Sequence, residues 1–65
     1  MTPYIQFIEY VRKSKEMSIS EFCKRAEYSR PLYYKVLNNT TSPSTDAFFK
    51  MLDVLEIDFK YVKRE

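Results

Sequence analysis

Apolar residues recur along this chain three or four positions apart, the spacing of one helix face, and no stretch alternates as a half-buried strand would. The first apolar stripe consists of Tyr4, Ile5, Ile8 and Val11. It follows Thr2 and Pro3, a capping threonine and a proline that suits the first helical position. The pattern therefore predicts a helix from Pro3 to about Ser14.

The second helix has the clearest start signal. Ser18 and Glu21 form a capping box, in which the serine hydroxyl accepts from the Glu21 amide and the carboxylate returns a bond to the Ser18 amide. Met17 and Phe22 occupy the two staple positions around this cap. The inward face consists of Phe22, Cys23 and Ala26. We expect this helix to end near Glu27.

A short turn leads to a third helix that covers about Pro31 to Asn38. Ser29 and Arg30 are both candidate cap residues. Because proline disfavours helical backbone at the residue before it, the pattern favours the later start, with Arg30 as the cap. Asparagine tolerates the left-handed conformation that ends many helices, so Asn38 and Asn39 form a suitable stop.

Two further helices are predicted in the last third of the chain. Ser44 caps the fourth helix and Asp46 lies favourably in its first turn. Its buried stripe comprises Phe48, Met51, Leu52 and Leu55. Asp58 caps a short fifth helix, with Ile57 and Val62 at staple positions. The expected fold is all-α, a compact five-helix bundle.

The length of 65 residues predicts one small domain over residues 1–65 with a single core, whose stability is marginal at this size. One cysteine allows no internal disulfide, and the absence of histidine excludes the common zinc sites. We therefore expect homodimerisation or very good helix packing to supply the remaining stability. The lone cysteine also fits a reducing, cytoplasmic setting.

Composition excludes several classes of function. The chain has no glycine, so phosphate-binding glycine loops and the dinucleotide fingerprint are absent. No apolar run exceeds three residues and no signal peptide is visible, so we expect no membrane association. Without histidine or an evident acidic pocket, we expect no catalysis, metal, cofactor or small-molecule ligand. Cys23 lies on an apolar helix face and is expected to be a buried, inert thiol.

Charge is modest but uneven. The net charge is +2, with seven Lys and Arg against four Glu in residues 1–45, and four basic against five acidic residues in residues 46–65. Mild basicity in the first two-thirds is compatible with a nucleic-acid partner. An ordinary solvated surface explains it equally well.

From Ile8 to Val62 the chain resembles the Cro and phage-repressor type of helix-turn-helix domain, a five-helix bundle that binds operator DNA as a dimer. The helix-turn-helix would span about residues 18–38. Its hydrophobic positions match Phe22, Ala26, Tyr28, Tyr33 and Val36. Ser29 with Arg30 matches the start of the recognition helix, which is the third helix.

Three positions depart from the family pattern. Glu27 stands where the family has glycine in the turn, and a left-handed conformation there would be strained. Ile19 replaces a glutamine that contacts phosphate, and isoleucine cannot donate a hydrogen bond. Leu37 replaces the glutamate that pairs with the first-helix arginine, which leaves Arg12 for DNA or for Glu9.

The resemblance implies that the third helix lies in the major groove, where its outward residues contact base edges. The expected base contacts are Arg30, Pro31 and Tyr34. A guanidinium can bond O6 and N7 of guanine together, which makes Arg30 the best candidate; a solvated arginine paired with Glu27 is the alternative. Tyr34 could contact a thymine methyl or a phosphate, or could pack against its own helix.

The remaining polar residues near this surface are expected to contact phosphates, which set the register of binding and carry no sequence information. They are Ser20, Ser29, Lys35, Asn38 and Thr40. Aromatic and aliphatic residues in excess of the core suggest a dimer contact in the last two helices. Those residues are Phe49, Val54, Phe59 and Tyr61.

The sequence thus predicts a sequence-specific regulator of transcription that binds double-stranded DNA. The compact size and the family suggest a repressor of phage or mobile-element type that binds a palindromic operator as a homodimer. The alternative is a helix-turn-helix scaffold for contact with a partner protein, or an architectural factor in excision and recombination. Ile19, Pro31 and the weak net charge favour that alternative.

Overall fold

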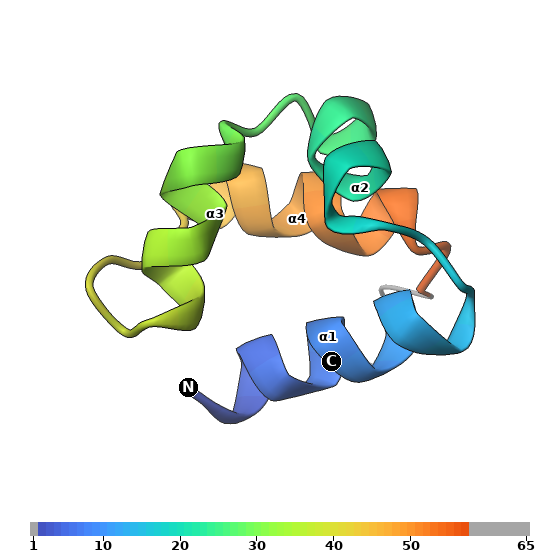
Figure 1. The fold of residues 1–65 in the computed structure, drawn as a ribbon, viewed down its shortest axis with the longest axis horizontal. Helices are drawn as coiled ribbons and strands as arrows, with labels where there is room; N and C mark the ends of the chain where they lie inside the picture. Colours follow the sequence, from blue (N-terminus) through green and yellow to red (C-terminus); the bar gives the residue numbers. More distant parts are fainter. Residues whose placement is uncertain (1, 58–65) are drawn as a thin grey trace, which may run out of the picture.

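The computed structural model describes residues 2–57, and these form four helices. They are α1 (Pro3–Ser14), α2 (Ile19–Ala26), α3 (Arg30–Leu37) and α4 (Thr45–Val54) (Figure 1). Every regular element in this part of the chain is helical, as expected, but the prediction of a five-helix bundle is wrong. The fifth helix was predicted from a cap residue and a staple pair, which mark a helix start and provide no length. That segment, from Asp58 onward, lies outside the described residues.

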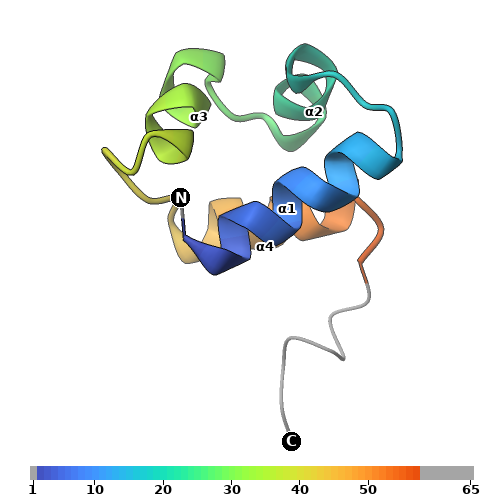
Figure 2. The ribbon, with the colours of Figure 1, turned by 60° about the horizontal axis from the view of Figure 1, so that its bottom comes forward.

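The helices surround one core. Figure 2 shows α2 and α3 together on one side of the domain and α1 in front of α4 on the other, and α4 also packs against α2. The largest fully buried side chains are Ile5, Ile8, Phe22, Tyr33, Met51, Leu52 and Leu55. They confirm the predicted apolar stripes at most positions. Tyr4 and Phe48 lie at the edge of the core, where their rings meet edge to face with centroids 5.2 Å apart.

Serine caps start three of the four helices. The side chains of Ser18, Ser29 and Ser44 each accept a hydrogen bond from the amide three residues later, at 3.1, 3.3 and 3.1 Å. Two of these caps were predicted, whereas the favoured cap of the third helix, Arg30, was wrong. Arg30 is the first helical residue, and Pro31 follows it in the first turn. Proline is tolerated there because the missing N–H would have no intrahelical partner.

Each helix ends at a left-handed residue that is not glycine. These residues are Glu16, Glu27, Asn39 and Glu56, with φ between 55° and 63°. In every case the amide of that residue bonds the carbonyl three residues back, and the next amide bonds the carbonyl five residues back. This hydrogen-bond pair is the Schellman motif, which glycine usually ends because other residues lose roughly 1–2 kcal/mol in the left-handed conformation. The predicted asparagine stop is confirmed, and Glu27 has the left-handed conformation for which strain was expected.

Candidate nucleic-acid interface

Aromatic packing fixes α3 against α2 and thereby decides which side of α3 faces outward. The Tyr33 ring is fully buried and meets Phe22 of α2 edge to face, with centroids 5.3 Å apart. Tyr28, in the turn between the helices, meets the same ring at 6.4 Å. Val36, one turn after Tyr33, is also buried. The opposite side of α3 is therefore the one available to a partner.

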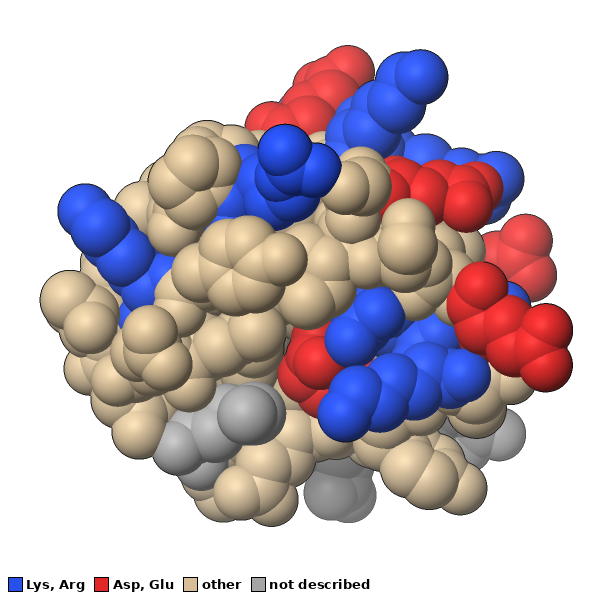
Figure 3. Space-filling model, in the orientation of Figure 1, with Lys and Arg blue, Asp and Glu red and all other residues tan. Residues whose placement is uncertain are grey.

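The three expected base-contact residues lie together on this outward side. Arg30, Pro31 and Tyr34 are all exposed, and about 100° of rotation per residue places them within one arc of the helix. Tyr34 keeps 48% of its surface accessible. The sequence of α3 contains no acidic residue, and Figure 3 shows only basic and uncharged atoms over this helix. The surface can approach a polyanion without like-charge repulsion from α3.

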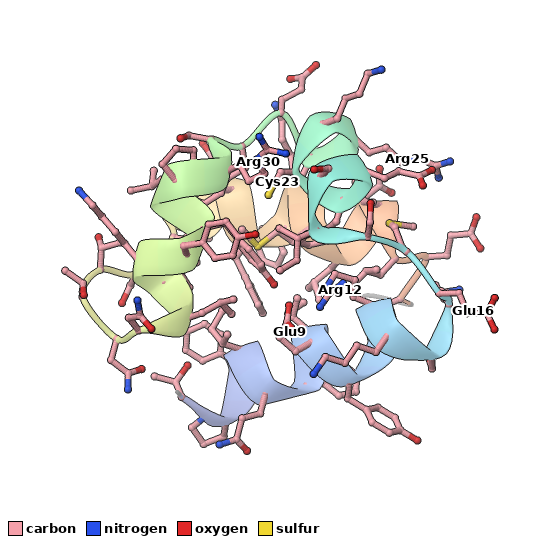
Figure 4. All side chains as sticks on the ribbon, in the orientation of Figure 1. Glu9, Arg12, Glu16, Cys23, Arg25 and Arg30 are labelled. Atoms are coloured by element: carbon pink, nitrogen blue, oxygen red, sulfur yellow. The ribbon has the colours of Figure 1, made fainter. Side chains whose placement is uncertain are left out.

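A hydrogen bond from α3 to α2 orients Arg30. Its Nη1 donates to the Ser20 hydroxyl at the start of α2. Figure 4 shows the guanidinium between the two helices, close to Cys23. The carboxylate of Glu27, the alternative partner, instead accepts from Lys50 Nζ at 2.7 Å, and this bond lowers the pKa of Glu27. Arg30 therefore points along the α2–α3 surface.

The residues expected to contact phosphate lie near both ends of α3, on either side of the base-contact residues. Ser20 and Ser29 lie near the start of α3, whereas Asn38 and Thr40 follow its end, and all four are exposed. Ser29 accepts from the Leu32 amide and Ser20 accepts from Arg30. A hydroxyl that accepts one bond still has its own proton to donate, so both serines remain able to bind a phosphate oxygen. Lys35, exposed in the last turn of α3, adds a positive charge.

A buried polar cluster lies beneath α3. Arg12 Nε and Nη2 donate to the two carboxylate oxygens of Glu9 at 2.9 and 2.7 Å, and its Nη1 donates to the Met17 carbonyl at 2.7 Å. The Tyr33 hydroxyl donates to Glu9 Oε2 at 2.6 Å. Of the two roles predicted for Arg12, DNA contact or pairing with Glu9, the structure has the second. The cluster links α1 to α3 although Leu37 cannot form an ion pair with Arg12.

The electrostatics of this cluster favour a charged Glu9–Arg12 pair. Burial alone would raise the pKa of the Glu9 carboxyl, but hydrogen bonds from Arg12 and Tyr33 more than offset it and lower that pKa. The hydrogen bond to Glu9 also raises the pKa of the Arg12 guanidinium above its ordinary value. Burial and the same carboxylate raise the pKa of Tyr33. Figure 4 shows Glu9 and Arg12 side by side on α1, directed into the domain.

Sequence reasoning identified only part of this cluster. The spacing of three between Glu9 and Arg12 indicates a possible pair on one helix. The contribution of Tyr33 carries no local signal, because its partner is 24 residues away and a buried tyrosine looks like any other core aromatic in the sequence. Cys23 is buried as expected, and burial raises its thiol pKa, which disfavours the nucleophilic thiolate.

The α1–α4 side has a different chemistry. An apolar hollow there is lined by residues of α1, α4 and the segments flanking α4, among them Pro3, Phe7, Pro43 and Phe48. Phe7 and Tyr10 on α1 remain 48% and 72% exposed. Of the expected dimer contacts, Phe49 and Val54 are half-buried against the core. Phe59 and Tyr61 lie outside the described residues.

Within residues 2–57, no three metal-ligating side chains come together. None of the described helices is long and apolar enough to cross a bilayer.

Comparison with known proteins agrees with this geometry. A family model described as Helix-turn-helix matches residues 8–62, which include all of α2, α3 and α4. No curated protein and no solved structure matches the chain. This is the family that the sequence of the chain resembles. The chain therefore belongs to the Cro/C1-type helix-turn-helix family of DNA-binding domains.

Proposed function

We propose that this DNA-binding domain is a sequence-specific repressor of transcription, which binds a palindromic operator as a homodimer in the cytoplasm with α3 in the major groove. Membership of the family supports binding to double-stranded DNA. The observation that carries the finer proposal is the outward side of α3. It is free of acidic residues and presents Arg30 in a fixed orientation beside exposed Pro31 and Tyr34.

Arg30 has the donors needed to bind guanine. A guanidinium carries five N–H groups, and the bond to Ser20 uses one of them. Four donors remain, enough to bond O6 and N7 of one guanine simultaneously. Ser20 thus acts as a positioning residue in addition to its expected contact with phosphate.

Contacts at the two ends of α3 would hold that helix in register. In this proposal Ser20, Ser29, Lys35, Asn38 and Thr40 bind phosphates on both sides of the base contacts. Such contacts supply affinity that depends steeply on salt, while the base contacts supply specificity.

A homodimer would place two copies of α3 about one helical turn of DNA apart, roughly 34 Å between half-site centres. We propose Phe49, Val54, Phe59 and Tyr61 as the dimer contact. Sedimentation at micromolar concentration tests this part separately: a dimer is expected, and a monomer would contradict it.

The experiment that tests the proposal is selection from random duplex DNA at near-physiological salt. The wild-type protein should enrich a two-fold symmetric sequence, and the Arg30→Ala, Lys35→Ala double variant should lose that enrichment. Both residues are exposed, so circular dichroism of the variant should match that of the wild type. No enriched sequence with the wild type would overturn the proposal.

A second function, a helix-turn-helix scaffold that binds a partner protein or shapes DNA during excision, is favoured by the α1–α4 side. Exposed Phe7 and Tyr10 lie on a helix that does not belong to the α2–α3 pair. Salt dependence separates DNA binding from a scaffold that binds only a partner protein, whereas a factor that shapes DNA would share the loss of affinity with salt. A DNA-binding protein with several phosphate contacts loses affinity steeply between 50 and 200 mM salt, on the order of 10³-fold or more for six contacts. A protein-binding module would show no DNA affinity to lose.

A further inference from the structure

We infer that α3 recognises thymine through its C5-methyl group, and that Pro31 and Tyr34 make this contact. The inference rests on the proposed operator binding and specifies which bases the operator must contain.

The side chains of α3 leave few other means of recognising a base. The usual partner of adenine is an Asn or Gln amide, and the usual partner of cytosine N4 is a carboxylate. From Arg30 to Leu37, α3 contains neither kind of side chain. Its hydrogen-bond donors to a base are Arg30, Lys35 and the phenol of Tyr34. Arg30 suits guanine and Lys35 is assigned to phosphate in the proposed function, so we expect further discrimination by this helix to come mainly from apolar contact.

Beside its basic residues, the outward side of α3 exposes apolar surface. Pro31 is exposed, and Tyr34 keeps 48% of its surface accessible. In a complex this side would lose its contact with water. The thymine methyl is the apolar group that a base pair presents in the major groove, and aromatic and aliphatic side chains pack against it. Burying these apolar side chains against a methyl group is therefore more favourable than burying them against a purely polar base edge.

The spacing of Pro31 and Tyr34 defines the pattern of methyl groups. Residues three apart on a helix have Cβ atoms about 5–6 Å from one another. Successive bases along one strand rise by about 3.4 Å, so the two side chains reach bases one or two steps apart. Ser20 holds Arg30 toward α2, on one side of this pair. The expected half-site therefore has a guanine with two thymines close to it.

The test replaces thymine by deoxyuridine in the selected operator, one position at a time. This substitution removes the methyl group and keeps every hydrogen-bonding group of the base. We expect binding to weaken about 3- to 10-fold at one or two positions per half-site, since a buried methyl contributes about that factor. Other thymines should tolerate the change.

Variants of Tyr34 identify the contact. Tyr34→Ala should weaken binding to the thymine duplex and abolish the difference between thymine and deoxyuridine at one position. Tyr34→Phe is the matched control, because it keeps the ring and removes only the hydroxyl. It should retain the full difference. If Tyr34→Phe instead weakens binding equally to both duplexes and Tyr34→Ala keeps the methyl effect, the tyrosine contacts a phosphate and the inference is wrong.

The outcomes separate this inference from the proposed function. If an operator is enriched but every deoxyuridine substitution changes the Kd less than 2-fold, the methyl inference is wrong and the operator binding stands. If the enriched operator lacks thymine near the guanine, the inference is likewise overturned. If no sequence is enriched, the proposed function itself fails.

Discussion

The two sides of this domain use different chemistry although they share one core. The α2–α3 side exposes hydroxyl groups and basic side chains beside the ring of Tyr34, with Arg30 bonded to Ser20. The α1–α4 side exposes aromatic rings around an apolar hollow, with Phe7 and Tyr10 48% and 72% accessible. A net charge of only +2 describes neither side. The difference shows that a surface suited to DNA depends on where acidic residues are placed more than on the total of basic ones.

The acidic residues of α2 and of the α2–α3 turn are paired with cations. Glu21 on α2 pairs with Arg25 at 2.6 Å, and Glu27 in the turn pairs with Lys50 at 2.7 Å. Exposed ion pairs of this kind contribute little to folding stability. Their effect is electrostatic: each neutralises a carboxylate that would repel phosphate beside the proposed binding surface. Figure 4 shows Arg25 on the side of α2 away from α3, so it is Arg30 that lies between the two helices.

The largest predicted effect concerns the cluster that joins the two sides. Glu9→Ala leaves the buried Arg12 without its carboxylate and the Tyr33 hydroxyl without its acceptor. Removing one partner of a buried pair costs about 3–5 kcal/mol in free energy of unfolding. Because a domain of 65 residues has about 3–10 kcal/mol in total, much of the protein should unfold at 25 °C. Circular dichroism and urea titration measure the loss.

Glu21→Ala is the matched control, since it breaks an exposed glutamate–arginine pair on a single helix. A pair of this kind contributes only about 0.3–0.5 kcal/mol. Equal destabilisation by the two variants would contradict the structural role assigned to the buried cluster.

The next largest effect concerns the salt dependence of DNA binding, tested with one lysine variant from each side of the domain. Lys35→Ala on α3 should weaken DNA binding for all sequences and reduce the slope of log K against log salt by about one, because one phosphate contact is lost. Lys13→Ala removes the same charge from the exposed surface of α1 and should leave the slope unchanged. Fluorescence anisotropy at several salt concentrations gives both slopes. If the two variants change the slope equally, the proposed orientation on DNA is wrong.

A smaller, graded effect is expected from acid. The pKa of Glu9 is lower in the folded state than in the unfolded chain, so its contribution to stability is complete above its ordinary value and is lost as pH falls through the folded value. Protonation is milder than deletion, because the neutral carboxyl can still accept hydrogen bonds. Urea titrations between pH 7 and pH 3 should show this loss. The Glu9→Gln variant should have a shallower pH dependence, and an unchanged one would contradict the role of Glu9.

The smallest effect is a gain in stability. Glu16→Gly removes the Cβ that strains the left-handed backbone at the end of α1. It also removes a negative charge from the C-terminal, negative end of the helix dipole. After the larger entropy of glycine in the unfolded chain is subtracted, we expect about 0.5–1 kcal/mol of stabilisation. Glu16→Ala removes the charge and keeps Cβ, so it isolates the contribution of strain. A thermal melt of the two variants decides whether glycine stabilises more than alanine.

The sequence was informative at most of its local signals, although the Thr2 side chain makes no capping bond at the start of α1. Helix starts at Ser18 and Ser44 and the stop at Asn39 depend on residues within one turn, and each was predicted. The third cap was misplaced by one residue because a steric preference at Arg30 was weighted above the capping bond that Ser29 makes.

Contacts between distant segments were the part that the sequence could not provide. Tyr33 was expected in the core, but its bond to Glu9 depends on how α3 lies across α1. Likewise, Glu27 was considered as a partner for Arg30, whereas the arrangement of α4 brings Lys50 to it. The outward position of Arg30, Pro31 and Tyr34 follows from helical spacing alone. Their contact with bases stays a prediction.

The glycine-free helix ends have a consequence for how long a molecule of this protein persists. The three strained glutamate ends bring the folded and unfolded states closer in free energy, and each 1.4 kcal/mol changes their ratio about tenfold. Proteases degrade the unfolded fraction, so turnover follows that ratio when opening is fast. Single substitutions at Glu16, Glu27, Asn39 or Glu56 could therefore adjust the cellular abundance of the protein while leaving every residue of its outward α3 surface unchanged.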